Sequence, residues 1–299
     1  MEQKSSDADR EICIWENNRD ECEGRREFQT KKENMKNLQS SGYAPVNGLK
    51  MYYEIYGEGT MPLVLIHGGG STIESTFGTL LPMLTGYGKI IAVELQAHGR
   101  TSDRDAPETF EQDADDVAAL LAWLKVDKAS IFGFSNGATT TLQLAIRHPE
   151  LVNKIVVASG AYRRDGFIPG FFEGFPNATL ANMPEPLKAA YLKVAPDKNN
   201  LQTMFDKDVA RMVNFKDIPD DAIRSIKASA LIMVTDHDVV VPDHAVKMLH
   251  LIAGSNLVIL PGGHGAFIGA AEAGGAGVDK KGISLPEMSV ALVEEFLGR

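Results

Sequence analysis

The segment Ala129-Ser130-Ile131-Phe132-Gly133-Phe134-Ser135-Asn136-Gly137 decides the fold. Its first part, residues 129–134, is a mostly apolar run typical of a buried strand. Residues 136–147 have the pattern of a helix, which stops before Pro149. The last five residues of the segment match G-x-S-x-G, so we expect a sharp strand–turn–helix that lifts the Ser135 hydroxyl off the end of a sheet.

The two glycines of this motif have a steric reason. A turn this sharp strains the backbone at the serine. Side chains two residues before and after it would collide, so Gly133 and Gly137 fit there. The helix that follows directs the positive end of its dipole toward the Ser135 hydroxyl. A glycine-rich turn with a capping serine is the alternative, but the strand before and the helix after favour a reactive serine.

Strands and helices alternate on both sides of this turn. We expect further strands at 49–57, 63–66, 90–95, 155–159, 230–235 and 257–260, and further helices at 111–124 and 285–297. This order predicts an α/β fold with a mainly parallel twisted sheet and helices on both faces. The strand pattern vanishes over about residues 163–227, where phenylalanines, prolines and helical patches predict an inserted helical cap. The Gly- and Ala-rich residues 269–282 are expected to form a loop.

The chain has 299 residues, of which 44% are hydrophobic and 23% charged, and this is ordinary globular composition. Residues 1–42 are highly charged and poor in large apolar side chains, so a disordered N-terminal extension before one domain at 43–299 is expected. A net charge of −10 argues against a nucleic-acid partner. We see no apolar run long enough for a membrane span and no signal peptide, so a cytoplasmic location is the expectation. The oligomeric state is not predicted.

A glycine-rich loop, His67-Gly68-Gly69-Gly70, follows the strand at 63–66. Glycines let the backbone approach a ligand closely, and aimed backbone N–H groups stabilise the negative charge that develops during acyl transfer. The N–H groups of Gly69, Gly70 and Asn136 are therefore the expected oxyanion-hole donors. His67 is expected to hold the loop. The loop lacks the pattern of a phosphate-binding P-loop.

A reactive serine needs a base and a group that orients the base. Of seven histidines, His264 follows the last expected strand, where sites of α/β folds gather. Asp236 and Asp238 both follow the strand at 230–235, and we prefer Asp238 as the orienting acid, with Asp236 shaping the turn. The chain order Ser135, Asp238, His264 is the order that G-x-S-x-G folds use.

These segments, together with the loop at 94–102, resemble the α/β-hydrolase superfamily over about residues 48–299. In that family the acid stands four residues before a proline such as Pro242, which supports Asp238. Ser135 counts against the members that use an aspartate nucleophile. Two departures from the family pattern are Ala97, where glycine is usual, and Asn136, where Met, Leu or Gln is frequent.

The resemblance implies a carboxylesterase-like serine hydrolase that cleaves a small acyl substrate through an acyl-enzyme, without a cofactor or a metal. Phe167, Phe171 and Phe172 are expected to line the substrate pocket, with ordinary cap packing as the alternative. A cofactor-free perhydrolase or haloperoxidase-like enzyme and a C–C bond hydrolase on the same three residues remain open. A non-catalytic binder of a small ligand also remains open.

Overall fold

The computed structural model describes residues 38–84, 88–273 and 283–298. By internal contacts the chain divides into residues 1–38 and 39–299, and the described elements belong to the second unit, whose first strand begins at Leu38. The predicted extension lies outside the described residues up to position 37. Its predicted end at residue 42 is wrong, because a strand begins at Leu38. Residues 39–41 of that strand are exposed and polar, so no apolar pattern marks them.

The centre of the fold is an eight-stranded sheet with the order β1-β2-β4-β3-β5-β6-β7-β8. The strands are β1 (Leu38–Val46), β2 (Leu49–Tyr56), β3 (Leu63–Ile66), β4 (Ile90–Val93), β5 (Ala129–Phe134), β6 (Val152–Ala158), β7 (Ser229–His237) and β8 (Asn256–Gly263). β2 runs antiparallel to β4, and the pairs from β4 across to β8 are parallel. The predicted mainly parallel sheet is confirmed.

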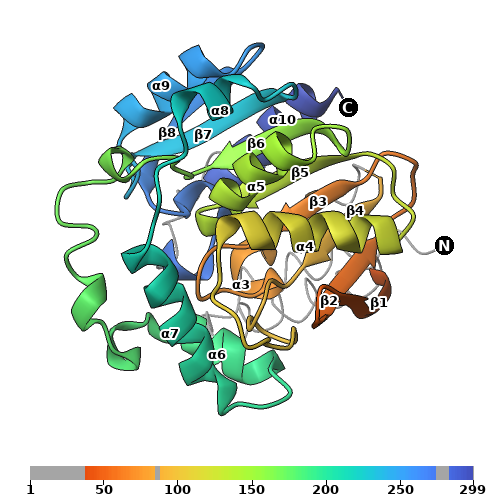
Figure 1. The fold of residues 1–299 in the computed structure, drawn as a ribbon. Helices are drawn as coiled ribbons and strands as arrows, with labels where there is room; N and C mark the ends of the chain where they lie inside the picture. The colour runs from red at the N-terminus through yellow and green to blue at the C-terminus, as the bar shows by residue number, and fades with distance from the viewer. Residues whose placement is uncertain (1–37, 85–87, 274–282, 299) are drawn as a thin grey trace, which may run out of the picture. The chain divides into compact units, whose positions relative to one another are not determined.

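Helices cover both faces of this sheet, which is why its central strands are continuous apolar runs. Val64 and Ile66 of β3 belong to the core shared with α4 (Phe110–Trp123) and α5 (Asn136–Arg147). On the other face the ring of Phe132 in β5 packs 5.5 Å from the ring of Phe77 in α3 (Ile73–Phe77). Figure 1 shows α4 and α5 lying across the strands.

The segment between β6 and β7 is helical, as predicted. It contains α6 (Glu185–Val194), α7 (Asn200–Val213) and α8 (Asp220–Arg224), preceded by short 3-10 turns. Figure 1 shows α6 and α7 below the sheet, apart from α4 and α5. We call residues 163–227 the cap. The other helices are α9 (Pro242–Leu251) and α10 (Leu285–Leu297).

The predicted loop at 269–282 is described only up to residue 273, where Ala271–Ala273 form a 3-10 turn. Residues 274–282 of that prediction lie outside the described part of the chain. None of the helices that the structure describes is both long and apolar enough to cross a membrane.

Candidate active site

Ser135 lies in a strained turn between β5 and α5. Its backbone has φ 54° and ψ −119°, which L residues other than glycine rarely adopt. A Cβ atom on Gly133 would lie 2.1 Å from the carbonyl oxygen of Gly137, and one on Gly137 would lie 2.3 Å from the carbonyl oxygen of Ile66. Only glycine fits at either position, so both are explained by the close approach of the backbone.

His264 and Asp238 meet the serine from two other strand ends. The Nε2 atom of His264 lies 3.1 Å from the Oγ atom of Ser135, and its Nδ1 atom lies 2.7 Å from Oδ1 of Asp238. His264 follows β8 and Asp238 follows β7. Because the Nδ1–H group of His264 donates a hydrogen bond to Asp238, the other ring nitrogen faces the hydroxyl as an acceptor.

The carboxylate of Asp238 is buried, and both of its oxygens accept hydrogen bonds. It accepts hydrogen bonds from the Ser159 hydroxyl at 2.5 Å, the Thr235 hydroxyl at 3.1 Å and the Val239 amide at 2.7 Å. Burial would raise the pKa of Asp238, but the hydrogen bonds from His264 and Ser159 outweigh it and lower the pKa. The group therefore stays ionised beside the imidazole.

Asp236, the alternative acid, has a different partner. Its Oδ1 atom accepts a hydrogen bond from the Gly262 amide at 2.8 Å, and no contact joins it to His264. This carboxylate ties the end of β7 to the end of β8. The geometry thus favours Asp238, while Ser159 is a site neighbour that no sequence motif marked.

The three amides predicted as oxyanion donors, those of Gly69, Gly70 and Asn136, differ in their partners. Among the described residues, the amides of Gly69 and Asn136 have no hydrogen-bond acceptor. The Gly70 amide, in contrast, donates to Oδ2 of Asp208 at 2.5 Å. The prediction that Gly70 is an oxyanion donor is therefore wrong, because a cap carboxylate from 138 residues further along the chain occupies it.

His67 holds the loop, as expected. Its Nδ1 atom lies 2.7 Å from the carbonyl oxygen of Gly68, and its Nε2 atom accepts from the Leu95 amide at 3.0 Å. Complete burial lowers the pKa of His67 to about 3. The imidazole is therefore neutral, which matches one donating and one accepting nitrogen.

Met183 and Leu187 of the cap cover the glycine-rich loop. A Cβ atom on Gly70 would lie 3.3 Å from Cε of Met183 and 3.8 Å from Cδ1 of Leu187. Neither residue was marked by the sequence, where two apolar side chains in a helical stretch look like any packing residue. They place apolar surface beside the oxyanion loop.

The phenylalanines predicted to line the pocket pack against one another. The Phe167 ring lies 4.5 Å from that of Phe171 and 5.0 Å from that of Phe172, and all three join a cluster with Phe110, Met212 and Phe215. No aromatic contact in the described part of the chain joins them to His264. These contacts favour the packing alternative.

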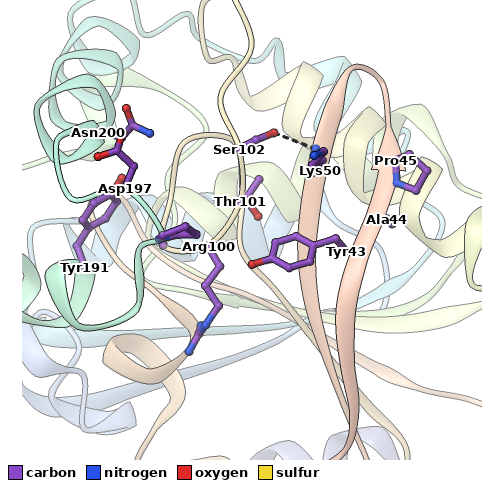
Figure 2. A pocket seen from close by; sticks show the side chains of 12 residues that line it. Tyr43, Ala44, Pro45, Lys50, Arg100, Thr101, Ser102, Tyr191, Asp197 and Asn200 are labelled. Atoms are coloured by element: carbon purple, nitrogen blue, oxygen red, sulfur yellow. Dashed lines mark hydrogen bonds between the residues drawn. The ribbon is translucent and has the colours of Figure 1, made fainter.

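A cavity of about 650 Å³ lies elsewhere, between the cap and the first strands. Figure 2 shows Tyr191, Asp197 and Asn200 on one side and Tyr43 and Lys50 on the other. Ser135, Asp238 and His264 are not among the residues that line this cavity. It is distinct from the Ser135 site.

Known proteins share this fold and parts of this sequence. Residues 61–204 match the family described as alpha/beta hydrolase fold. The human protein named serine hydrolase BPHL is 29% identical over 242 residues, which are 75% of this chain and 79% of that protein. A 2-hydroxy-6-oxo-6-(2'-aminophenyl)hexa-2,4-dienoic acid hydrolase of Metapseudomonas resinovorans is 30% identical over 122 residues, which are 40% of this chain and 42% of that protein.

Solved structures agree with the family match at the level of the fold. The carboxylesterase CesB from Bacillus subtilis superposes with a TM-score of 0.65 and 19% identity, covering 92% of this chain and 98% of that one. This likeness concerns the arrangement of strands and helices and does not extend to the substrate. The sheet order and the helical insertion therefore give the chain the α/β-hydrolase fold, and residues 61–204 match the family of that name.

Proposed function

We propose that the protein is a serine hydrolase that cleaves an ester or a similar small acyl substrate through an acyl-enzyme. The observation that carries the proposal is the unbroken chain of hydrogen-bond distances from Ser135 Oγ through His264 to Asp238. It starts at a serine held in a strained backbone conformation at the start of a helix. The resemblance to the human serine hydrolase supports the same chemistry.

The geometry supports a reaction in two halves. Ser135 Oγ attacks the substrate carbonyl carbon while His264 Nε2 takes the hydroxyl proton. The amides of Gly69 and Asn136 hold the oxyanion, and losing one such donor costs about 3 kcal/mol of transition-state stabilisation. His264 then gives its proton to the leaving group, which departs and leaves an ester on Ser135.

The second half returns the enzyme to its starting state. A water molecule gives a proton to His264 Nε2 and attacks the acyl carbon, and the Ser135 oxygen leaves with that proton as the acid is released. Asp238 stays ionised throughout and stabilises the charged imidazole. No proton passes beyond His264.

The test is a Ser135→Ala variant assayed on a short p-nitrophenyl ester and with a fluorophosphonate probe. Turnover and labelling should both be lost, with an unchanged circular dichroism spectrum. Ser225→Ala is the matched control, because Ser225 is an exposed serine at the end of α8 whose hydroxyl donates only to a carbonyl of its own turn. Unchanged turnover in Ser135→Ala defeats the proposal, and a wild-type protein that neither turns over nor labels favours a non-catalytic binder.

C–C bond hydrolysis on the same three residues is the second candidate, because the Metapseudomonas relative is named as the hydrolase of a 2-hydroxy-6-oxo dienoic acid, which is not an ester. A panel that sets esters and lactones against a vinylogous diketone separates the two. Turnover of the diketone well above that of the esters would favour C–C cleavage. The reverse order supports the esterase proposal.

A further inference from the structure

The carboxylate of Asp208 crosses from cap helix α7 to the glycine-rich loop. In addition to accepting the Gly70 amide, its Oδ2 atom would lie 3.3 Å from a Cβ atom on Gly69. The same Cβ atom would lie 2.5 Å from the side-chain nitrogen of Asn136, the residue after Ser135. Asp208 therefore lies against the loop next to the proposed nucleophile. It is 9% exposed, so water shields its charge little.

Two buried cations hold the charge on Asp208. Arg211, one turn further along α7, pairs with its Oδ1 atom, and His98 Nε2 lies 3.0 Å from its Oδ2 atom. Burial would raise the pKa of Asp208, but Arg211 and His98 outweigh it and lower the pKa. Burial would likewise lower the pKa of His98, but Asp208 outweighs it and raises the pKa to about 9. The contact to Gly70 is therefore a charge-assisted hydrogen bond.

The two peptide groups that flank Gly69 are each clamped by a side chain. The carbonyl of Gly68 accepts from His67, and since the peptide is planar and trans, the Gly69 N–H points the opposite way. The next N–H, that of Gly70, is held by Asp208. Glycine has the widest backbone freedom of any residue. The direction of the Gly69 amide therefore depends on both clamps, one from the sheet and one from the cap.

We propose that Asp208 is a positioning residue that fixes the Gly69–Gly70 peptide and so aims the Gly69 amide at the oxyanion. Through it, the seating of the cap on the sheet determines whether the oxyanion hole is assembled. The inference rests on the proposed hydrolytic function and adds a residue that does not itself touch the substrate carbonyl.

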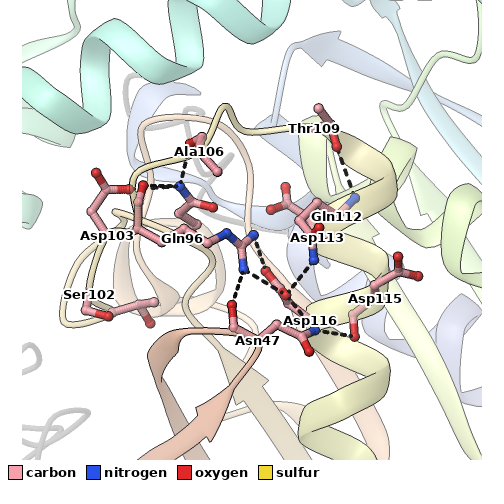
Figure 3. Close-up of polar contacts among 12 residues, drawn as sticks. Asn47, Gln96, Ser102, Asp103, Ala106, Thr109, Gln112, Asp113, Asp115 and Asp116 are labelled. Carbon is pink, nitrogen blue, oxygen red and sulfur yellow. Dashed lines mark hydrogen bonds and ion pairs between the residues drawn. The ribbon is translucent and has the colours of Figure 1, made fainter.

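Lys207, the neighbour of Asp208 on α7, provides a matched control. Its Nζ atom lies 2.6 Å from Oδ1 of Asp103 and 2.7 Å and 2.8 Å from the carbonyl oxygens of Arg104 and Ala106. Figure 3 shows that the side-chain amide of Gln96 donates to both Asp103 and Ala106, so Lys207 binds a loop that has its own hydrogen bonds. Lys207 thus anchors the same helix to the core without touching the glycine-rich loop.

The experiment compares Asp208→Asn with Lys207→Met in the full-length protein, using kcat and KM for the p-nitrophenyl ester. Deleting an oxyanion donor outright lowers kcat about 10²- to 10³-fold, so misaiming one should lower kcat about tenfold or more, with a smaller change in KM. Lys207→Met should change kcat much less. A second readout is the NMR signal of the Gly70 amide proton in glycine-labelled protein, which should move upfield in Asp208→Asn only.

The outcomes separate the inference from the proposed function. If the wild-type enzyme hydrolyses the ester and Asp208→Asn has the same kcat, the inference is overturned. Equal losses in both variants also overturn it, because α7 then acts as a general cap anchor. An unmoved Gly70 signal overturns it independently of activity. A wild-type protein without hydrolytic activity, but with the shifted Gly70 signal, refutes the proposed function and leaves the clamp itself demonstrated.

Discussion

Two of the histidine–aspartate pairs among the described residues, His264–Asp238 and His98–Asp208, differ in what the second ring nitrogen meets. In the first pair the Nδ1 atom of His264 is hydrogen-bonded to Asp238, and its Nε2 atom faces the Ser135 hydroxyl. In the second pair the Nε2 atom of His98 lies 3.0 Å from Oδ2 of Asp208, and its Nδ1 atom lies 2.7 Å from the carbonyl oxygen of Gln96. An imidazole acts as a base only through a nitrogen that is free to take a proton. Only His264 has one.

The two pairs also differ in access. The side chain of His264 is 20% exposed, whereas that of His98 is fully buried. A substrate and its leaving group must reach the imidazole that exchanges protons with them. The same two side chains in contact therefore form a proton-transfer pair at His264 and a fixed charge pair at His98.

The largest difference between the two pairs should appear when each histidine is replaced by glutamine. His264→Gln should lower kcat about 10⁴-fold or more, since removing the base of such a set removes most of its catalysis. His98→Gln should lower kcat far less, because its contribution acts through Asp208 and the Gly70 amide. The measurement is kcat on the p-nitrophenyl ester. Similar losses in the two variants would show that the pairs do not differ as argued.

The next largest effect concerns the acid of the first pair. Asp238→Asn should lower kcat about 10⁴-fold, because the amide favours the wrong tautomer of the imidazole. Asp236→Asn is the control, since that carboxylate accepts only the Gly262 amide on the neighbouring strand. Its kcat should stay near that of the wild type. A larger loss in Asp236→Asn than in Asp238→Asn would reassign the acid.

The buried cluster around the second pair should affect stability as well as turnover. Arg211→Met leaves Asp208 and Asp113 buried without their shared cation, which costs about 3–5 kcal/mol of unfolding free energy. The Arg211 side chain is only 2% exposed. Arg147→Met breaks the exposed pair with Asp115 and should cost about 0–1 kcal/mol. Urea unfolding measures both, and equal costs would mean that water screens the Arg211 cluster.

Local patterns carried most of the fold. β3 and α10 have the bounds that the sequence predicts, because an apolar run between turn residues and a capped amphipathic stretch are complete signals within a few residues. The whole of β1 was missed, because this edge strand beside β2 buries only Ala44 and Val46. The G-x-S-x-G turn was predictable for the same local reason.

The site was predictable only as far as its motifs reached. Ser135, Asp238 and His264 each follow a strand, so parallel strand order implies that they meet at one edge of the sheet. The occupation of the Gly70 amide by Asp208 was not predictable, because the cap that brings them together has no fixed register against the sheet in the sequence. Ala97 was noted in the sequence only as a departure from the family's glycine. Its backbone has φ 60°, in the left-handed region that favours glycine.

The finest distinction between the two pairs is a dependence of stability on pH. The pKa of His98 is raised to about 9 in the folded protein, against 6.5 in the unfolded chain. The titratable and charged groups that face it are Asp208, Glu108, Arg211 and His67. Its stabilisation is therefore complete below about pH 6.5 and lost as the pH rises through 9. The unfolding free energy of the wild type should exceed that of His98→Gln most at pH 6.5 and least at pH 9, as measured by urea unfolding.

The carboxylates around His98 ionise in both proteins. Burial raises the pKa of Glu108 to about 8, and the charge on His98 opposes that rise, so His98→Gln also changes the ionisation of Glu108. The difference between the two proteins therefore measures the charge on His98 together with its effect on these carboxylates. A difference that stays constant from pH 6.5 to 9 would mean that His98 is neutral in the fold. Asp208 would then hold Gly70 without the second cation, and the contrast with His264 would rest on access alone.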